Sequence, residues 1–227
     1  MPELKKAMNN ITERLLRIDC CAVSDALDKL GIKDQVASGL EQRSTTRRIA
    51  GRVVTYRLVP AAEAPVQSGA PRHLGTSAIE LAKPGEVIVV EQRTGIDAGS
   101  WGGILTLGAK VKGVAGVVVD GPVRDIDEAR SYNFPVYCRA LTARTARSRV
   151  AELECNGPVN IGGVSVQPGD YVIADASGIA FVPAADAERV LDTAEAIAGR
   201  EAAMAKALLD GKPITEVMGA DYEHMLR

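Results

Sequence analysis

The sequence predicts an α/β fold, because helical and strand-like segments alternate along the chain until about residue 140. Beyond that point, residues 159–183 hold several short strand-like runs between glycine turns, and residues 186–209 form one long helical run. Of the 227 residues, 46% are hydrophobic and 25% are charged, which is enough for one buried core. Because no linker, repeat or low-complexity segment divides the chain, we expect one domain over residues 1–227, with N-terminal helices, a C-terminal helix and more than one sheet layer.

The first expected elements follow ordinary start and stop signals. Asp19 is placed to cap a short amphipathic helix that stops at Gly31. Residues 48–60 form a strand-like run, rich in β-branched residues, that ends at a proline. A helix is expected in residues 76–84, and a buried strand in residues 86–91.

The middle of the chain repeats the helix and strand alternation. A helix is expected from Gly102 to Lys112, followed by strands over residues 114–119 and 134–140. The Gly121-Pro122 pair is typical of a turn, so the first of these strands should end before it.

Composition excludes several classes of partner. The formal net charge of −2 and the absence of a dense Lys/Arg cluster argue against nucleic acid and anionic membranes as partners. The N-terminal residues lack an apolar signal core, and no window approaches the length of a membrane span, so a cytoplasmic location is expected. The cysteines lack zinc-site spacing and disulfide-scaffold density, and we expect reduced, mostly structural thiols at Cys20, Cys21, Cys138 and Cys155.

A glycine pair, Gly102-Gly103, stands at the start of an expected helix. The first backbone N–H groups of a helix lack intrahelical partners, and the helix dipole favours an anion there, so a carboxylate can bind at this point. The other interpretation is a plain tight turn.

Arg124 and Asp125 follow a strand end, so both should emerge at the rim of a sheet, where α/β proteins commonly place ligand sites. Arginine offers a planar charged fork for a carboxylate or enolate, and aspartate a hard oxygen ligand for Mg²⁺ or Mn²⁺. The alternative is a capping box, with Asp125 as the helix cap and Glu128 at the third helical position.

Other polar residues carry weaker indications. Glu201 falls on the apolar stripe of the long C-terminal helix, where a carboxylate needs a partner. One interpretation is that it contacts a basic group or a metal-bound water across a subunit contact. The other is that it lies solvated at the edge of the stripe. The remaining candidates lack the context that their chemistry requires: His73 and His224 have no metal-ligand spacing, Ser100 has no nucleophile elbow, and a Schiff base at Lys110 or Lys112 would need desolvation.

The chain resembles the RraA-like proteins, which include 4-hydroxy-4-methyl-2-oxoglutarate/4-carboxy-4-hydroxy-2-oxoadipate aldolases. The resemblance runs from VSDALDKLG through GGIL and AKVKGVAGVVVDGPVRD to PGDYVIADASGIAFVP. It implies a swivelling β/β/α three-layer domain assembled as a homotrimer or homohexamer. Active sites between neighbouring subunits and a divalent metal, Mg²⁺ or Mn²⁺, are also implied.

The resemblance also implies roles for residues of this chain. Arg124 would contact the keto or enolate oxygen of a 2-oxo acid, and Asp125 would hold the metal, so no lysine Schiff base is required. Four residues would bind the pyruvyl carboxylate through their backbone: Gly102, Gly103, Ile104 and Leu105.

This chain departs from the family pattern at Gly103, where characterised aldolases commonly carry an acidic residue. Asp97 is a nearby carboxylate that can substitute for it, or the substrate needs no such group, as in oxaloacetate decarboxylation. The family places a glutamate from a neighbouring subunit in the site, and Glu201 is the candidate here.

One alternative function remains open at this point, and a third interpretation is discounted. Some relatives are non-catalytic inhibitors that bind ribonuclease E, but these lack the metal-binding aspartate, whereas Asp125 is present here. A demethylmenaquinone methyltransferase is disfavoured, because the chain has no glycine-rich fingerprint for a nucleotide-like cofactor.

Overall fold

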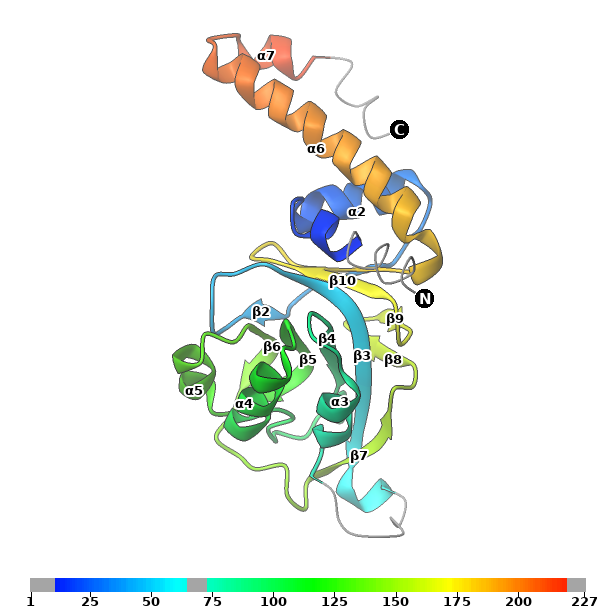
Figure 1. Cartoon of the computed structure of the whole chain (residues 1–227), viewed down its shortest axis with the longest axis vertical. Helices are drawn as coiled ribbons and strands as arrows, with labels where there is room; N and C mark the ends of the chain where they lie inside the picture. Colours follow the sequence, from blue (N-terminus) through cyan, green and yellow to red (C-terminus); the bar gives the residue numbers. More distant parts are fainter. Residues whose placement is uncertain (1–10, 65–72, 220–227) are drawn as a thin grey trace.

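The computed structural model describes residues 11–64 and 73–219 and is built on a nine-stranded sheet (Figure 1). Eight strands follow the order β1-β11-β10-β3-β4-β5-β6-β2, and β7 pairs with β3. The strands of this sheet are β1 (Val36–Ala37), β2 (Glu41–Gln42), β3 (Ile49–Pro60), β4 (Val87–Glu91), β5 (Gly116–Val123), β6 (Val136–Leu141), β7 (Val150–Cys155), β10 (Tyr171–Ala174) and β11 (Ile179–Val182). A separate hairpin is formed by β8 (Val159–Ile161) and β9 (Val164–Val166).

The long strand β3 joins two differently built parts of the sheet. Its first residues pair antiparallel with β10, from Ile49 opposite Ala174 to Arg52 opposite Tyr171. Its later residues pair parallel with β4, which is followed by the parallel strands β5 and β6. The parallel strands carry continuous runs of valine because both of their faces are covered.

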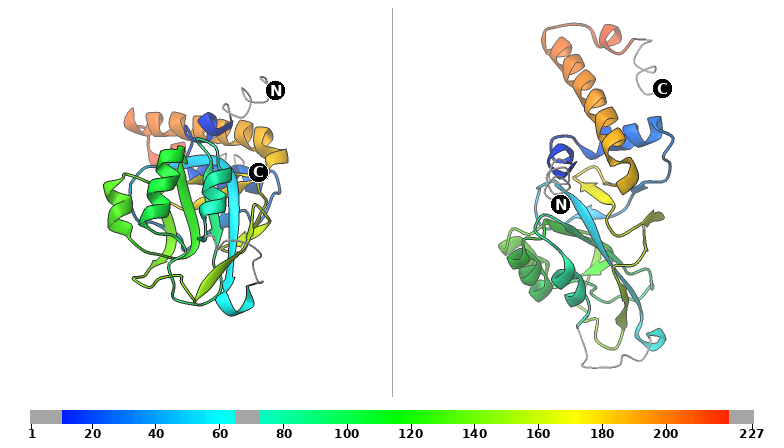
Figure 2. Two further views of the ribbon diagram at one scale, coloured as in Figure 1. Left: turned by 60° about the horizontal axis from the view of Figure 1, so that its bottom comes forward. Right: turned by 45° about the vertical axis from the view of Figure 1, so that its right-hand side comes forward.

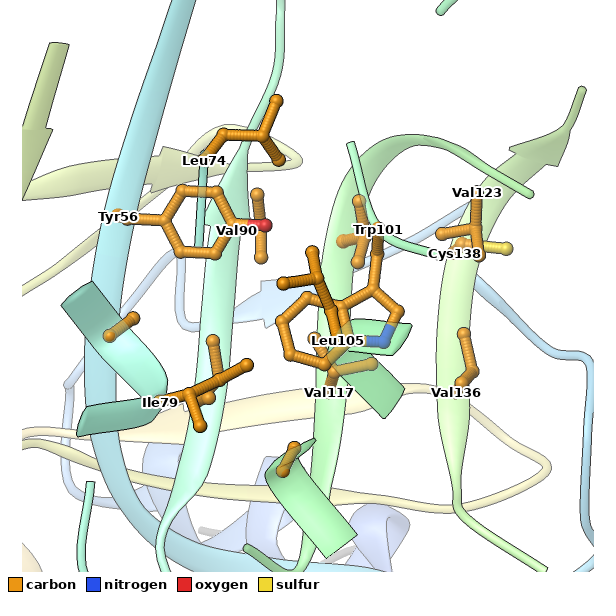
Figure 3. Packing of buried hydrophobic residues seen from close by; sticks show 14 of the residues in the cluster. Tyr56, Leu74, Ile79, Val90, Trp101, Leu105, Val117, Val123, Val136 and Cys138 are labelled. Atoms are coloured by element: carbon orange, nitrogen blue, oxygen red, sulfur yellow. The ribbon is translucent and has the colours of Figure 1, made fainter. Parts of the chain in front are cut away.

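Three helices cover one face of the parallel strands: α3 (Thr76–Leu81), α4 (Gly103–Lys112) and α5 (Ile126–Ser131). Figure 3 shows the core between them and the sheet, where Tyr56, Trp101 and Leu105 pack with the valines of β4 and β5. On the opposite face, the β8–β9 hairpin and the strands β10 and β11 bury a second cluster that includes Val118, Tyr137 and Phe181, so the layers are sheet, sheet and helix.

The remaining helices pack on the β10–β11 end of the sheet and include α2 (Cys20–Lys29) and α6 (Ala187–Leu209). The expected cap of α2 is confirmed, because the Asp19 carboxylate accepts a hydrogen bond from the Ala22 N–H at 2.8 Å. The short elements are η1 (Ala61–Glu63), η2 (Ala184–Asp186) and α7 (Ile214–Val217). Among the described residues, no helix combines the length and apolar character that a membrane crossing needs.

The prediction that Gly121-Pro122 forms a turn was wrong. Strand β5 continues through both residues to Val123, with a register irregularity between Val119 and Pro122. An irregularity of this kind tolerates a proline, which has no N–H to donate to a regular ladder.

The apolar stripe predicted along the C-terminal helix is buried only in its first half. Val190, Ala194 and Ile197 are buried, whereas Met204 is half-buried and Leu208 is exposed. The second half of α6 therefore projects beyond the sheet, together with α7 (Figures 1 and 2).

Candidate active site at the amino end of helix α4

A cavity of about 240 Å³ lies where the loop after β4, the end of β5 and the loop between β6 and β7 meet. Its lining includes residues 101–105, Arg124 and Asp125, which places every residue predicted for carboxylate and metal binding in one hollow. Because this is the carboxyl end of parallel strands, the position agrees with the usual ligand-binding edge of an α/β sheet.

Helix α4 begins without a side-chain cap. Gly102 is its N-cap residue, with an extended backbone and no side chain of its own to cap the helix. Asp125 contributes one contact, since its Oδ2 accepts from Gly103 N at 3.1 Å. The start of the helix is as predicted and its first residues line the cavity, whereas carboxylate binding there stays a prediction.

Trp101 fixes the loop that leads into α4. Its side chain is 1% exposed and packs beside Leu105 (Figure 3). Its Nε1 donates to Thr106 Oγ1 at 2.8 Å, and that hydroxyl donates to the Gly102 carbonyl at 3.0 Å. The floor of the cavity is therefore held by a buried aromatic side chain rather than by a loose loop.

Arg124 and Asp125 lie directly against this loop. Arg124 N donates to the Trp101 carbonyl at 3.0 Å, and Arg124 Nε donates to both Asp125 carboxylate oxygens at 3.1–3.2 Å. The Asp125 side chain is 31% exposed, so both the carboxylate and the guanidinium remain accessible from the cavity.

The capping-box interpretation of Asp125 was wrong. Asp125 does stand at the N-cap position of α5, but its backbone is left-handed (φ 57°) and its side chain makes no capping hydrogen bond. Aspartate tolerates this conformation better than most residues, although some strain remains. The conformation turns the carboxylate away from α5 and toward Gly103 N in the cavity.

The glycines of this loop are required for the side chains to approach. A Cβ atom on Gly99 would lie 2.8 Å from Arg124 Cγ, and one on Gly102 would lie 2.8 Å from Asp125 Oδ2. Such distances are too short for a real side chain. Glycine at positions 99 and 102 therefore allows the Arg124 and Asp125 side chains to lie against the backbone of this loop.

Glu128 is a residue that the sequence reasoning placed only in a capping box. Its carboxylate lies over Gly103, so that a Cβ atom built on Gly103 would overlap Glu128 Oε2. A carboxylate thus lies beside the position where this chain lacks an acidic residue. The sequence signal for this contact is the spacing of Asp125 and Glu128, which places two carboxylates on one helical turn next to Arg124. The same spacing also predicts a capping box.

The other predicted acids lie outside the cavity. Asp97 pairs with Arg144 at 3.4 Å and does not line the cavity. Glu201 is exposed on α6, a helix that packs against α2 rather than against α4. Partial desolvation and the negative charges of Asp19 and Asp25 raise the pKa of Glu201 above its usual range.

Of the residues with weaker indications, His73 lines the cavity, whereas Ser100, Lys110 and Lys112 do not. Lys110 donates to the Tyr132 carbonyl and Lys112 pairs with Glu80, so neither lysine is desolvated in the site. Ser100 is buried and bonds to Gln92, His73 lines the rim of the cavity, and His224 lies outside the described residues.

The donor set at the cavity fits a divalent cation that is shared with a substrate. No three metal-ligating side chains cluster anywhere in residues 11–64 and 73–219, so a cage of protein ligands is not formed there. Mg²⁺ typically takes one or two carboxylates and fills its other positions with water and substrate oxygens. Asp125 supplies one such accessible carboxylate in the cavity, together with open space for the other ligands.

This combination of fold and site defines an α/β protein with a small cavity at the carboxyl end of a parallel sheet, lined by the start of a helix, an arginine and an aspartate. The match to the family model "RraA-like: Aldolase/RraA" covers residues 20–181, and the chain belongs to that family. The match includes α4, Arg124 and Asp125.

Two curated relatives are similar to this chain over most of its length. The chain is 31% identical over 195 residues to a Halalkalibacterium halodurans protein provisionally named as a 4-hydroxy-4-methyl-2-oxoglutarate aldolase, covering 85% of this chain and 86% of the relative. It is 29% identical over 209 residues to protein DlpA of Legionella pneumophila, covering 92% of this chain. The chain spans only 33% of the length of DlpA.

Solved structures confirm the predicted β/β/α fold. An uncharacterised protein from Pseudomonas syringae superposes with a TM-score of 0.82 at 28% identity, covering 93% of this chain and 98% of the other. RraA from Thermus thermophilus, described as an RNA-processing inhibitor, superposes with a TM-score of 0.58 at 28% identity, covering 71% and 92%. The family therefore contains proteins named as aldolases and proteins named as regulators.

Proposed function

We propose that this chain is a divalent-metal-dependent carbon–carbon lyase. It cleaves a 4-hydroxy-2-oxo diacid to pyruvate and a second 2-oxo acid, and the same site decarboxylates oxaloacetate. The observation that carries the proposal is the meeting of Arg124, Asp125 and the first turn of α4 in one small cavity.

The pyruvyl carboxylate binds at the start of α4. Backbone N–H groups in the first turn have no intrahelical acceptors, and the positive end of the helix dipole favours an anion. Residues 102–105 line the cavity at this point and include no acidic side chain. The substrate is thereby oriented with its 2-oxo group toward Arg124 and Asp125.

Arg124 stabilises the negative charge that develops on the 2-oxo oxygen when the bond between C3 and C4 breaks. Its guanidinium is held by Asp125, so little reorganisation is needed as the enolate forms. Asp125 would hold Mg²⁺ or Mn²⁺, which, when bound, supplies Lewis-acid polarisation of the 2-oxo group. A carboxylate with one third of its surface accessible suits that role.

Aldol cleavage also requires the proton of the C4 hydroxyl to leave while C4 becomes a carbonyl. Glu128 is the carboxylate beside Gly103 and next to the carboxylate site, and in this proposal it accepts that proton through water. Decarboxylation of oxaloacetate has no such proton to remove, so it depends on Arg124 and Asp125 but not on Glu128.

A second copy of the chain completes the site in this proposal. Helix α4 presents an outward apolar row beside the cavity, with Ile104 and Val111 each 81% exposed and Leu107 39% exposed. The projecting half of α6 also exposes apolar side chains, including Leu208, and carries Glu201. A homotrimer or homohexamer in which α6 of one copy packs on α4 of another would bring Glu201 to the neighbouring cavity.

The test is a substrate panel followed by pyruvate release. Purified protein with Mg²⁺ is offered 4-hydroxy-2-oxo diacids and oxaloacetate, and at least one should be cleaved. EDTA should abolish turnover, and added Mg²⁺ or Mn²⁺ should restore it. Turnover that resists EDTA would refute the metal-dependent mechanism.

Absence of pyruvate release from every substrate of the panel would favour the alternative, a non-catalytic regulatory protein similar to the RraA inhibitors. The likeness to Thermus RraA and the exposed apolar row on α4 both support a protein partner in that case. If the chain cleaves no substrate of the panel and binds ribonuclease E, this alternative is established.

A further inference from the structure

The cavity has a second cationic side that the proposed chemistry does not use. Besides the Arg124–Asp125 pair, the lining includes His73, Thr145 and Arg147. Thr145 and Arg147 come from the loop between β6 and β7, so this side is built by different elements from the carboxylate site at α4.

Arg147 differs from the other arginines of its loop. Arg144 pairs with Asp97, and Arg149 donates to the Thr145 carbonyl at 3.2 Å. The guanidinium of Arg147 has no hydrogen-bond or ion-pair partner among the residues that the structure describes. It is therefore a charged group in the wall of a cavity whose preferred partner, an anion, is not supplied by this part of the chain.

The backbone holds Arg147 in place at the cavity. Arg149 N donates to the Ala146 carbonyl at 2.9 Å, which closes a turn with Arg147 at one of its two central positions. Ala146 is buried in the same core cluster as Trp101, and Gly99 N donates to the Arg144 carbonyl at 3.0 Å. The loop is thus fastened to the segment that carries the first carboxylate site, which fixes the two sites relative to each other.

The charges of the lining favour a ligand with two anionic ends. Arg124 is already balanced by Asp125 at 3.1 Å, whereas no carboxylate in the lining balances Arg147. A guanidinium binds a carboxylate through two parallel hydrogen bonds, which gives orientation as well as affinity. A volume of about 240 Å³ suits a small diacid rather than a nucleotide or a polymer.

We infer that Arg147 binds the distal carboxylate of the substrate and makes this cavity selective for 2-oxo diacids over 2-oxo monoacids. Thr145 and His73 line the same cavity, and the ring of His73 is held by donation from Nδ1 to the Leu74 carbonyl at 3.0 Å. The identity of the proximal end as a 2-oxo acid site rests on the proposed function. The selectivity itself is a property of binding and can be measured without turnover.

The experiment compares two ligands of equal length that cannot undergo aldol cleavage. Isothermal titration calorimetry with Mg²⁺ measures the affinity of the wild-type chain for 2-oxoglutarate and for 2-oxopentanoate, which has a methyl group in place of the distal carboxylate. We expect 2-oxoglutarate to bind about 10-fold more tightly, as one charge-assisted contact provides. Arg147→Ala should remove this preference, and Arg147→Lys should retain part of it.

Arg144→Ala is the matched control, because it removes an equal charge from the same loop and from a side chain that pairs outside the cavity. It should keep the preference for 2-oxoglutarate. Equal binding of the two ligands by the wild-type chain, or an equal loss for both in Arg147→Ala, would overturn the inference.

Failure of this inference is distinguishable from failure of the lyase proposal. A wild-type chain that prefers 2-oxoglutarate but cleaves no panel substrate would support the diacid site and refute the lyase. A chain that turns over panel substrates with an unchanged KM in Arg147→Ala would refute the diacid site and leave the lyase standing.

Discussion

Asp125 is the residue on which the metal-dependent chemistry rests. Asp125→Ala removes the one accessible carboxylate of the lining, and turnover should fall by at least about 100-fold at saturating Mg²⁺, measured as pyruvate release. Asp127→Ala is the control, because Asp127 is exposed and pairs only with Arg130 one turn along α5. Near-normal kinetics for Asp125→Ala would reduce the residue to a structural role.

Arg124 should be sensitive to shape as well as charge. Arg124→Lys keeps the positive charge but loses the planar fork, so we expect kcat to fall by about 10-fold or more, with a smaller change in KM. The measurement is steady-state turnover of the panel substrate that the wild-type chain cleaves best. An unchanged kcat would mean that Arg124 does not contact the reacting oxygen.

Gly103 and Glu128 should behave as a pair. Glu128→Ala should slow aldol cleavage by about 100-fold, as loss of a general base does, while oxaloacetate decarboxylation changes much less. Gly103→Asp alone should impair both activities, because it brings a second carboxylate next to that of Glu128, which must move aside, and the added negative charge opposes binding of the substrate carboxylate.

The double variant Gly103→Asp with Glu128→Ala makes room for the new side chain and should recover aldol cleavage relative to Glu128→Ala. Both activities are followed in parallel assays, and their ratio is compared. A ratio that is the same in wild type, Glu128→Ala and the double variant would place the proton path elsewhere.

At the scale of elements, an ion-pair hub joins the N-terminal helical segment to α6. Arg14 bonds to three acidic side chains of α6, Glu188, Asp192 and Glu195, at 2.6–2.8 Å. Its hydrogen bond to Glu195 lowers the pKa of that carboxyl below its usual range. Since the acidic partners are largely solvated, the stabilisation should be modest, about 1 kcal/mol.

The hub should give a defined pH dependence. A carboxyl with a lowered folded-state pKa contributes stability above its unfolded pKa of about 4.3, and that stability is lost as the pH falls through the folded value. Arg14→Met should therefore lower Tm at pH 7, and the difference from wild type should shrink below about pH 4. Thermal unfolding across this range checks it, and a difference that stays constant with pH would contradict the ion-pair account.

Much of the element order could be predicted from sequence because its signals are local. The cap at Asp19 and the glycines that open α4 act within one helical turn. The continuation of β5 through Gly121 and Pro122 could not be predicted, because it depends on pairing with β6, far along the chain. The contact of Glu128 with Gly103 likewise depends on how α5 packs beside α4.

At the scale of the whole molecule, the proposed assembly can be tested by mixing two inactive chains. If Glu201 acts in the cavity of a neighbouring copy, Asp125→Ala and Glu201→Gln should each be nearly inactive. Co-refolded mixtures should then regain part of the activity, because some sites receive an intact Asp125 from one chain and an intact Glu201 from the other. Absence of regained activity in mixed oligomers would remove Glu201 from the site.

The apolar row of α4 gives an independent test of assembly. Val111→Glu places a charge on a side chain that is 81% exposed in the single chain and does not line the cavity. If this row lies in a subunit contact, light scattering should show a shift to smaller species, and Lys110→Glu on the same helix should shift the mass less. An unchanged mass for Val111→Glu would exclude the row from the contact.

The two pairings of strand β3 affect the order in which the sheet forms during synthesis as well as the stability of the folded sheet. One part of β3 pairs with β4, which is the next strand along the chain, and another pairs with β10, which is synthesised only after β7, β8 and β9. The nascent chain therefore carries a half-paired strand for most of its synthesis, and its unpaired edge could recruit another chain. The sheet is completed only when the β10–β11 hairpin has formed and β10 has paired with the first residues of β3.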